Sequence, residues 1–358
     1  MNTIFIVPIE PLETRYTGEW YGHLPATLTR QIADNESEYQ VRVIDGDVVS
    51  PRPSPGAFLD FAATNIYKSS QLISIAEMFR DGEVKPGDKF LFTDFWNTCA
   101  LQLRYMSDLN GIPVEIHGLA HAGNYDPNDF LGRIKDGDWA KATEQAFYHA
   151  YTNIWFATHT HLDLFSDNVM GSGFEDSADK LRITGWPMEY MQSMNKPYIK
   201  TEKKDIVLFP HRLAPEKQPE IFDMLAERMP EYEFIKCQDK ELTKREYHTL
   251  LAESKVVFSA NLQETLGISG PEGMCFGAIP LVPLRLSYLE MFDPEFTYPS
   301  EWTTSLEAAE EHADDLVALI RHAVQNYGNL QTKLQHNKNK ILRNFFSADA
   351  LYAELLDL

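Results

Sequence analysis

The feature that most constrains the fold of this 358-residue chain is a regular alternation of short apolar runs with longer amphipathic segments. The runs are rich in β-branched and aromatic residues, as expected of strands that are buried on both faces. Strand–helix alternation of this kind predicts a parallel sheet with helices on both sides. A long helical pattern covers Ala57–Phe79. The strands predicted in the first half are Thr3–Pro8, Tyr39–Ile44, Lys89–Thr93, Val114–His117, Ile154–Ala157 and Leu181–Thr184.

The alternation stops once and then begins again. Residues 191–204 are polar and have no clear period, so we interpret them as a linker. This divides the chain into an N-terminal α/β domain at 1–190 and a second α/β domain at 205–340. Residues 341–358 form a terminal helical segment. The second domain has predicted strands at Ile206–Phe209, Glu233–Lys236, Val256–Ser259 and Ile279–Val282, a helix start at Gly270–Phe276 and a long acidic helix at Leu306–Tyr327.

Charge and cysteine content exclude several classes of protein. There are 32 Lys and Arg against 53 Asp and Glu, a net charge of −21, and residues 1–195 hold 14 basic and 27 acidic side chains. This balance argues against a broad nucleic-acid-binding surface but leaves a local basic groove open. The three cysteines, Cys99, Cys237 and Cys275, form no CxxC pair, so neither a disulfide framework nor a zinc site is expected. With no signal peptide and no apolar run of about 18 residues, we expect a cytoplasmic protein without a membrane span.

The segment Ser259–Val282 (SANLQETLGISGPEGMCFGAIPLV) is the most informative in the sequence. A polar loop containing Glu264 and Gly267 follows a strand, and a helix is predicted to begin at Pro271 with Glu272 in its first turn. Backbone N–H groups at such a helix start bind anions, and carboxylates accept hydrogen bonds from sugar hydroxyls. The spacing alone is also compatible with a solvated loop glutamate and a helix-capping glutamate.

A second polar segment, Phe209–Lys217 (FPHRLAPEK), also follows a strand. Arg212 and Lys217 are five positions apart, so they would meet a diphosphate from two sides. An ordinary basic turn before a helix is the alternative.

These two segments together resemble the donor site of the retaining nucleotide-sugar glycosyltransferases with the GT-B fold. That family typically reads Glu-Gly-Phe-Gly, then Glu-Ala-Met-Ala-Cys-Gly-x-Pro-Val, with Gly-Arg-Leu-x-x-x-Lys-Gly upstream. In this chain Thr265-Leu266 replaces Gly-Phe, Gly273 replaces the first Ala, and His211 and Gln218 replace the upstream glycines.

The resemblance implies two Rossmann-like domains whose parallel sheets face a central cleft. It implies a UDP- or GDP-sugar donor, transfer with retention at the anomeric carbon, no obligatory metal or other cofactor, and a terminal helix that crosses back to the N-terminal domain. The residues it implies are Arg212, Lys217, Leu266 and Gly267 for the donor diphosphate, Glu272 for the ribose and Glu264 for the sugar.

In the N-terminal half the resemblance is carried by shorter segments. Ile116-His117-Gly118 resembles the strand end whose histidine contacts the transferred sugar, although a buried structural histidine is an equal alternative. Thr14–Gly18 resembles the opening loop of the family, which implies Arg15 and Gly18 as acceptor or phosphate contacts. Asp94 and its aromatic neighbours in Phe92–Asn97 would present a carboxylate and stacking surface to an acceptor, or pack in the core.

The sequence leaves more than one acceptor and more than one function open. The phrases PIEPLETRYTGEWY and GLAHAGNYDPNDF resemble glycosyltransferase-like proteins of tailed bacteriophages, some of which glycosylate hydroxymethylated bases in phage DNA, in the host cytoplasm. The acidic N-terminal half fits a glycan, lipid-linked or small-molecule acceptor better, and both classes stay open. A sugar-nucleotide epimerase of the same architecture and a non-catalytic nucleotide-sugar binding protein are the rival functions. We interpret Asp45-Gly46-Asp47, Asp136-Gly137-Asp138 and the His159/His161 pair as structural rather than as metal sites.

Overall fold

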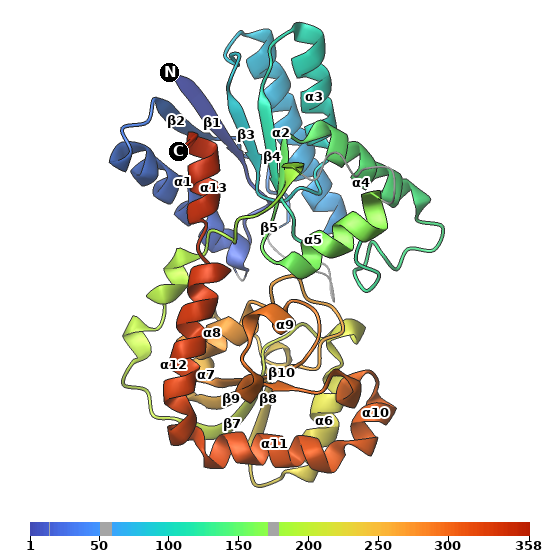
Figure 1. Cartoon of the computed structure of the whole chain (residues 1–358), viewed down its shortest axis with the longest axis vertical. Helices are drawn as coiled ribbons and strands as arrows, with labels where there is room; N and C mark the ends of the chain where they lie inside the picture. Colours follow the sequence, from blue (N-terminus) through green and yellow to red (C-terminus); the bar gives the residue numbers. More distant parts are fainter. Residues whose placement is uncertain (14, 51–58, 171–178) are drawn as a thin grey trace. The chain divides into compact units, whose positions relative to one another are not determined.

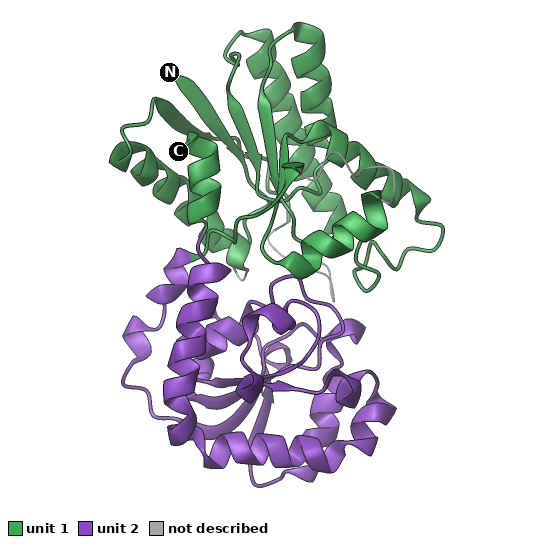
Figure 2. Cartoon of the chain, in the orientation of Figure 1, with its two compact units in different colours: residues 1–188, 348–358 green, residues 189–347 purple. Residues whose placement is uncertain are grey.

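The computed structural model describes residues 1–13, 15–50, 59–170 and 179–358. They form two compact units, the first made of residues 1–188 with 348–358 and the second of residues 189–347 (Figure 2). Residues 191–204, predicted to be a linker, lie in the second unit, which begins with two 3₁₀ helices at Glu189–Gln192 and Lys196–Tyr198.

The first unit is built on a six-stranded sheet in which every pair of neighbours is parallel, as the sequence predicts. The strand order is β2-β1-β3-β4-β5-β6 (Figure 1). All four residues of β3 are buried, as expected for a strand with helices on both faces. The strands are β1 (Asn2–Val7), β2 (Tyr39–Val43), β3 (Lys89–Phe92), β4 (Glu115–Leu119), β5 (Asn153–Phe156) and β6 (Leu181–Ile183).

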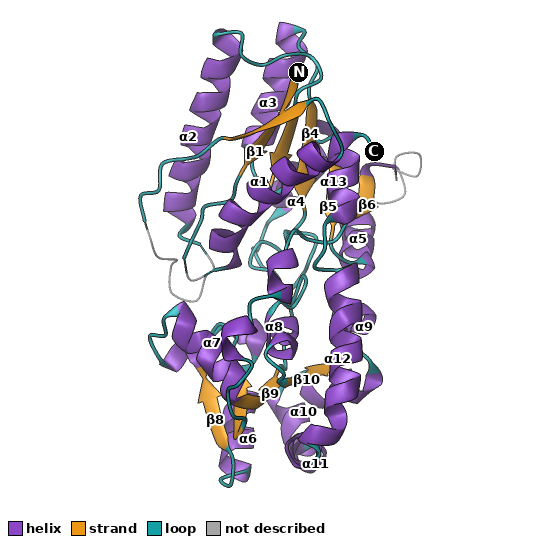
Figure 3. Cartoon of the chain, turned by 90° about the vertical axis from the view of Figure 1, so that its left-hand side faces the viewer, coloured by secondary structure: helices purple, strands orange, loops and turns teal. Residues whose placement is uncertain are grey.

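Helices cover both faces of this sheet. Figure 3 shows α2 and α3 on one side of the strands and α1 with α13 on the other. Helix α2 begins at Phe61 rather than at Ala57, because the Asp60 carboxylate caps it by accepting from the N–H groups of Ala62 and Ala63. Ala57 and Phe58 lie outside the described residues. The helices are α1 (Tyr16–Asp34), α2 (Phe61–Arg80), α3 (Cys99–Asn110), α4 (Asp138–Ala150), α5 (His159–Phe165) and α13 (Asp349–Leu356), with a π-helical turn at Ser166–Met170.

The second unit is built on a five-stranded parallel sheet with the order β11-β10-β9-β7-β8. The two-residue edge strand β11 has no counterpart among the strands predicted from the sequence. The strands are β7 (Lys204–Phe209), β8 (Glu233–Lys236), β9 (Ser254–Phe258), β10 (Ile279–Pro283) and β11 (Thr297–Tyr298).

One helix predicted in the second unit is divided in the structure. The acidic helix predicted over Leu306–Tyr327 is two helices, because the chain breaks at His312, which ends α10 and precedes α11. The helices are α6 (Pro219–Arg228), α7 (Lys244–Glu253), α8 (Ser269–Cys275), α9 (Tyr288–Met291), α10 (Leu306–Glu311), α11 (Ala313–Gln325) and α12 (Tyr327–Asn344).

The end of the chain belongs to the first unit. Helix α12 ends at Asn344 in the second unit, and α13 packs with α1 in the first. Asp357, just beyond α13, accepts a hydrogen bond from the Lys89 ammonium at 2.7 Å and another from the Tyr39 hydroxyl at 2.8 Å. Glu354 accepts from Trp155 Nε1 at 2.7 Å. Polar contacts from three strands therefore fix the terminal helix to this sheet.

None of the helices in the described part of the chain is both long and apolar enough to cross a membrane.

The Lys89 contacts yield a stability prediction. Lys89 is 1% exposed, and its ammonium lies 2.7 Å from Asp357 and 3.7 Å from Glu115. Its two carboxylate partners are partly exposed, so Lys89→Ala acts chiefly by leaving a cavity where a buried side chain packed, and it should lower the free energy of unfolding by about 2 kcal/mol in urea denaturation. Lys85→Ala, at an exposed lysine nearby, should change it little. Equal stability of the two variants would contradict the anchoring role of Lys89.

Candidate functional site

The chemistry-bearing loops of the second unit meet at the point where its strand order reverses. From β7 the chain moves to β8 on one side and later returns through β9 on the other. The loops that follow β7 and β9 therefore leave the sheet side by side at its carboxyl edge, where open α/β sheets bind ligands. The first loop carries Arg212 and Lys217, and the second carries Glu264 and Gly267.

Lys217 and Glu264, predicted from separate segments, form a buried ion pair. Lys217 Nζ lies 3.0 Å from Glu264 Oε1 and also donates to the Gln263 carbonyl. Their side chains are 6% and 15% exposed. Burial alone would raise the pKa of Glu264, but the Lys217 ammonium and the neighbouring His211 and Arg212 hold it below its ordinary value. Glu264 is therefore an ionised hydrogen-bond acceptor at neutral pH.

Arg212 joins this group from the same loop as Lys217. Its Nη2 donates to Glu216 Oε1 at 2.8 Å, and its charge contributes to lowering the pKa of Glu264. The structure thus brings Arg212, Lys217 and Glu264 together at one sheet edge, and it gives each cation a carboxylate partner.

Three side chains that sequence reasoning missed surround Glu264. Asn261 Nδ2 donates to Glu264 Oε1 and lies 3.3 Å from the Tyr288 hydroxyl. His211 Nδ1 lies 3.2 Å from Asn261 Nδ2 and 3.3 Å from Ser269 Oγ. His211 occupies the position of a glycine in the resembling family. That substitution was the only sequence signal for this group.

Arg285 and Gln218 hold the start of the loop after β9 in place through hydrogen bonds to its backbone. Arg285 donates to the carbonyls of Asn261 and Ala260, both at 2.7 Å, and to the Thr303 carbonyl at 3.0 Å. Gln218 Nε2 donates to the same Ala260 and Thr303 carbonyls at 2.6 and 2.7 Å. Buried carbonyls need donors, and here two side chains supply them at a sheet edge.

Gly267 is required by both its backbone and its surroundings. Its φ is +62°, and a Cβ there would lie 2.4 Å from Tyr288 Cε1. The preceding Leu266 is buried.

The helix predicted to begin at Pro271 begins at Ser269 and has seven residues. Glu272 lies in its first turn as predicted, and its Oε2 accepts from the Tyr247 hydroxyl at 2.8 Å. Burial raises the pKa of Glu272, against the opposing effects of Tyr247 and Lys244.

In the first unit the strand order reverses between β1 and β3. Asp94 follows β3, accepts from the Trp96 backbone N–H at 3.0 Å and lies 3.7 Å from the Lys68 ammonium. Arg15 immediately precedes α1, and Gly18 lies in its first turn, where a Cβ would lie 2.8 Å from the Leu12 carbonyl oxygen. Thr14, part of the same predicted loop, lies outside the described residues.

His117 does not end its strand, contrary to prediction, because β4 continues to Leu119. Its ring is 1% exposed, stacks on Trp155 at 4.7 Å and has a partner at each nitrogen, Glu115 at 3.1 Å and Asn153 at 3.4 Å. Burial lowers the pKa of His117 despite the Glu115 carboxylate. These contacts are those of the structural alternative, a buried histidine in a sheet.

His121, two residues beyond β4, is the histidine at the carboxyl edge of the sheet. Its Nε2 lies 2.6 Å from the Thr93 carbonyl, which only accepts, so Nε2 carries the proton. Burial lowers the pKa of His121 and favours the neutral ring, whose Nδ1 then accepts from the Tyr16 hydroxyl at 2.8 Å. The ring also packs against Trp20 and Trp186. The strand predicted to end at His117 extends two residues further, so His121 rather than His117 lies at this edge.

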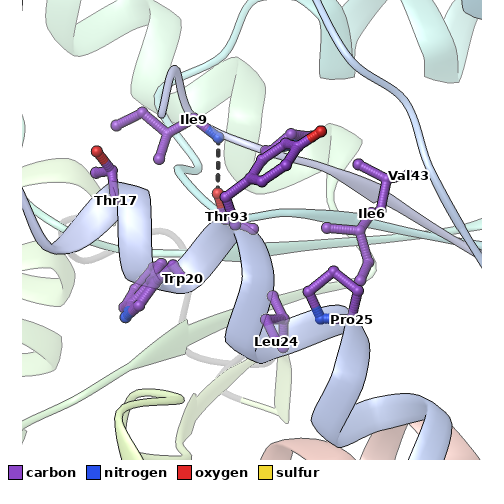
Figure 4. A pocket seen from close by; sticks show the side chains of 10 residues that line it. Ile6, Ile9, Thr17, Trp20, Leu24, Pro25, Val43 and Thr93 are labelled. Carbon is purple, nitrogen blue, oxygen red and sulfur yellow. Dashed lines mark hydrogen bonds between the residues drawn. The ribbon is translucent and has the colours of Figure 1, made fainter. Parts of the chain in front are cut away.

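A small apolar cavity lies beside this edge, between α1 and the ends of β1 and β3. Figure 4 shows Trp20, Leu24 and Thr93 around it. Its volume of about 10 Å³ is near the minimum for a single water molecule, so it binds no substrate as it stands. In the described part of the chain, no three His, Cys, Asp or Glu side chains are grouped so that they would hold a metal ion.

The burial of His211 yields a prediction about acid stability. Burial lowers the pKa of His211 to about 4, against the opposing charge of Glu264. In the unfolded chain a histidine takes up a proton near pH 6.5, so the folded state loses stability as the pH falls from 6.5 towards 4. Between pH 7 and pH 5 this one group should account for about 2 kcal/mol in urea denaturation.

His211→Gln should remove that part of the loss, whereas the exposed His336→Gln should retain it. If wild type and both variants lost the same free energy over this range, His211 would not be the neutral buried group described.

Comparison with solved structures places this architecture in one fold. Sucrose-phosphate synthase from Thermosynechococcus elongatus aligns with 99% of this chain and 97% of its own at a TM-score of 0.60 and 12% identity. The catalytic domain of starch synthase IV from Arabidopsis thaliana, bound to ADP and acarbose, covers 96% of this chain and 99% of its own at a TM-score of 0.55 and 11% identity. Anabaena HepE, in complex with UDP and glucose, aligns with 100% of this chain and 99% of its own at a TM-score of 0.55 and 11% identity.

No protein-family model matches the sequence, and no curated protein matches it either. The similarity is thus one of structure at low sequence identity. The chain has the GT-B fold of these glycosyltransferases, with two Rossmann-like α/β units that are each built on a parallel sheet.

Proposed function

We propose that this protein is a glycosyltransferase that moves a sugar from a nucleotide-diphosphate sugar to an acceptor hydroxyl with retention of configuration. The observation that carries the proposal is the buried Lys217–Glu264 pair with Arg212 beside it, at the switch point of the second sheet. The same residues resemble the donor site of the family whose fold the chain has.

The second unit binds the donor in this proposal. Arg212 and Lys217 neutralise the diphosphate, with the backbone at Leu266 and Gly267 beside it, and so stabilise the charge that develops on the leaving group. Both cations have carboxylate partners, Glu216 and Glu264, so a diphosphate must compete with those carboxylates for them. Glu264, ionised and buried, accepts hydrogen bonds from the sugar.

Glu272 binds the ribose hydroxyls. Tyr247 occupies one of its carboxylate oxygens, and the other is the acceptor we assign to the ribose. The donor is a UDP- or GDP-sugar. Of the similar structures, one holds UDP with glucose and another holds ADP. The proposed mechanism needs no metal.

The first unit binds the acceptor in this proposal, through Asp94 and the start of α1 with Arg15 and Gly18. His121 lies beyond the strand at the sheet edge but, like His117, it is buried and has a partner at each ring nitrogen, so we assign neither histidine a direct contact with the transferred sugar. A hydroxymethylated base of phage DNA and a glycan or small molecule are the two acceptor classes.

The first experiment is a thermal-shift screen with UDP-, GDP-, ADP- and dTDP-sugars and the free diphosphates, with NAD as the control. A ligand that binds only the folded state raises the melting temperature. A shift with one nucleotide family identifies the donor base, and no shift with any of them would contradict the proposal. Incubation with the identified donor then separates the rivals, since an epimerase changes the donor sugar without an acceptor and a binding protein leaves it intact.

The donor-site assignment predicts the effect of two substitutions. Arg212→Ala and Glu272→Gln should each weaken binding of the identified donor more than about tenfold, because each removes a charge-assisted hydrogen bond. Isothermal titration calorimetry measures the dissociation constants. Arg228→Ala and Glu220→Gln, at exposed positions on α6, are the matched controls and should bind like wild type. Donor binding by the first two variants at wild-type strength would show that the site is wrongly assigned.

A further inference from the structure

Charged side chains gather at the carboxyl edge of the first unit, where β1 and β3 end. Glu10 follows β1, Asp94 follows β3, and Asp60 begins α2. Lys68 of α2 lies among them, because its ammonium is 3.7 Å from Asp94 Oδ2 and acts electrostatically on Glu10. The same ammonium donates to the Trp96 carbonyl at 2.7 Å. Glu10 and Asp94 thus lie near one cation at the switch point of the sheet, the position where ligands bind, and Asp60 acts electrostatically on Glu10.

Glu10 is the unusual member of this group. It is 1% exposed, and its Oε1 has no hydrogen-bond partner in the described part of the chain. Burial raises the pKa of Glu10, Asp60 raises it further, and Lys68 opposes both. A buried acceptor without a donor costs free energy, which a ligand that supplies the donor would recover. Asp94 and Asp60, by contrast, already accept from backbone N–H groups.

Partly exposed aromatic rings lie within two positions of two of these carboxylates, Asp60 and Asp94. Phe61 follows Asp60, is 46% exposed and packs on Phe130 with ring centroids 5.1 Å apart. Trp96 packs on Trp139, which is 53% exposed, at 6.1 Å. Aromatic faces and carboxylate acceptors are complementary to a ring that carries C–H groups on its face and hydrogen-bond donors on its rim.

We propose that Glu10 and Asp94, linked by Lys68, bind the acceptor substrate, and that the part of the acceptor entering this site is an uncharged ring rich in hydrogen-bond donors. The inference rests on the proposed transferase function. Among the described residues, three carboxylates against the Lys68 ammonium and Arg15, which the proposed function places at the same edge, still leave a net negative charge, which repels a phosphate or carboxylate on the entering group. A sugar ring and a hydroxymethylated nucleoside both have the required chemistry.

Direct binding tests this site without a donor. The probes are methyl α-glucopyranoside, methyl β-glucopyranoside and 5-hydroxymethyl-2′-deoxycytidine, with glucose 6-phosphate and glucuronate as anionic counterparts, followed by saturation-transfer NMR titration. We expect at least one neutral probe to bind, and the one that binds distinguishes a sugar from a nucleoside. We expect the anionic probes to bind at least about tenfold more weakly.

Glu10→Gln replaces one acceptor oxygen by a donor with almost no change of shape. It should weaken binding of the neutral probe about tenfold and reduce the difference in affinity between the neutral and the anionic probes. Glu13→Gln, three positions on and exposed, is the matched control and should bind like wild type. Equal melting temperatures of the three proteins show that the variants fold.

The inference is overturned if no neutral probe binds, if the anionic probes bind as well as the neutral ones, or if Glu10→Gln leaves neutral binding unchanged. The donor screen is a separate measurement on the second unit. Donor binding without acceptor binding therefore overturns the inference alone, and absence of donor binding overturns the proposed function.

Discussion

The candidate site depends on the buried ion pair of Lys217 and Glu264. A charged side chain this deeply buried needs an opposite charge beside it. Each of these two side chains supplies that charge to the other, although they come from two different loops. The pair needs the backbone around it to be fixed. Arg285 and Gln218 both donate hydrogen bonds to the carbonyls of Ala260 and Thr303 and so hold this backbone in place. Charge and backbone geometry are therefore fixed together.

The first unit uses a buried lysine for a different purpose. Lys89 lies within β3 and pairs with Asp357, 268 positions later, beyond the last helix. The ion pair adds little stability in itself, because the Asp357 carboxylate is largely exposed to solvent. The ion pair does, however, fix the position of its two partners, whereas apolar contacts would allow the helix several positions. The helix α13 is largely apolar on its buried side, so Lys89 and Trp155 give it a register through Asp357 and Glu354.

The sequence sufficed for the sheets and for much of the second-unit site, because both rest on local patterns. Apolar runs locate all the longer strands, and parallel order then places Arg212, Lys217 and Glu264 at one edge. Strand ends were harder to predict. The run ending at His117 continues through Gly118 and Leu119, so the edge position falls on His121. The contacts of Arg285 and Tyr288 with the 259–267 loop come from tertiary packing, and no spacing in the sequence indicates them. The break at His312 likewise lies in a sequence with helical periodicity throughout.

The two sheet edges differ in their balance of charge, and this difference assigns their ligands. In the second unit Arg212 and Lys217 balance Glu216 and Glu264, so moving a carboxylate away from either cation creates a site for an anion. In the first unit the Lys68 ammonium lies near both Glu10 and Asp94, so pairing with one of them leaves the other uncompensated. This difference supports the proposal that the second unit binds the diphosphate. It likewise supports the proposal that the first unit binds a neutral partner that donates hydrogen bonds, as an acceptor hydroxyl does.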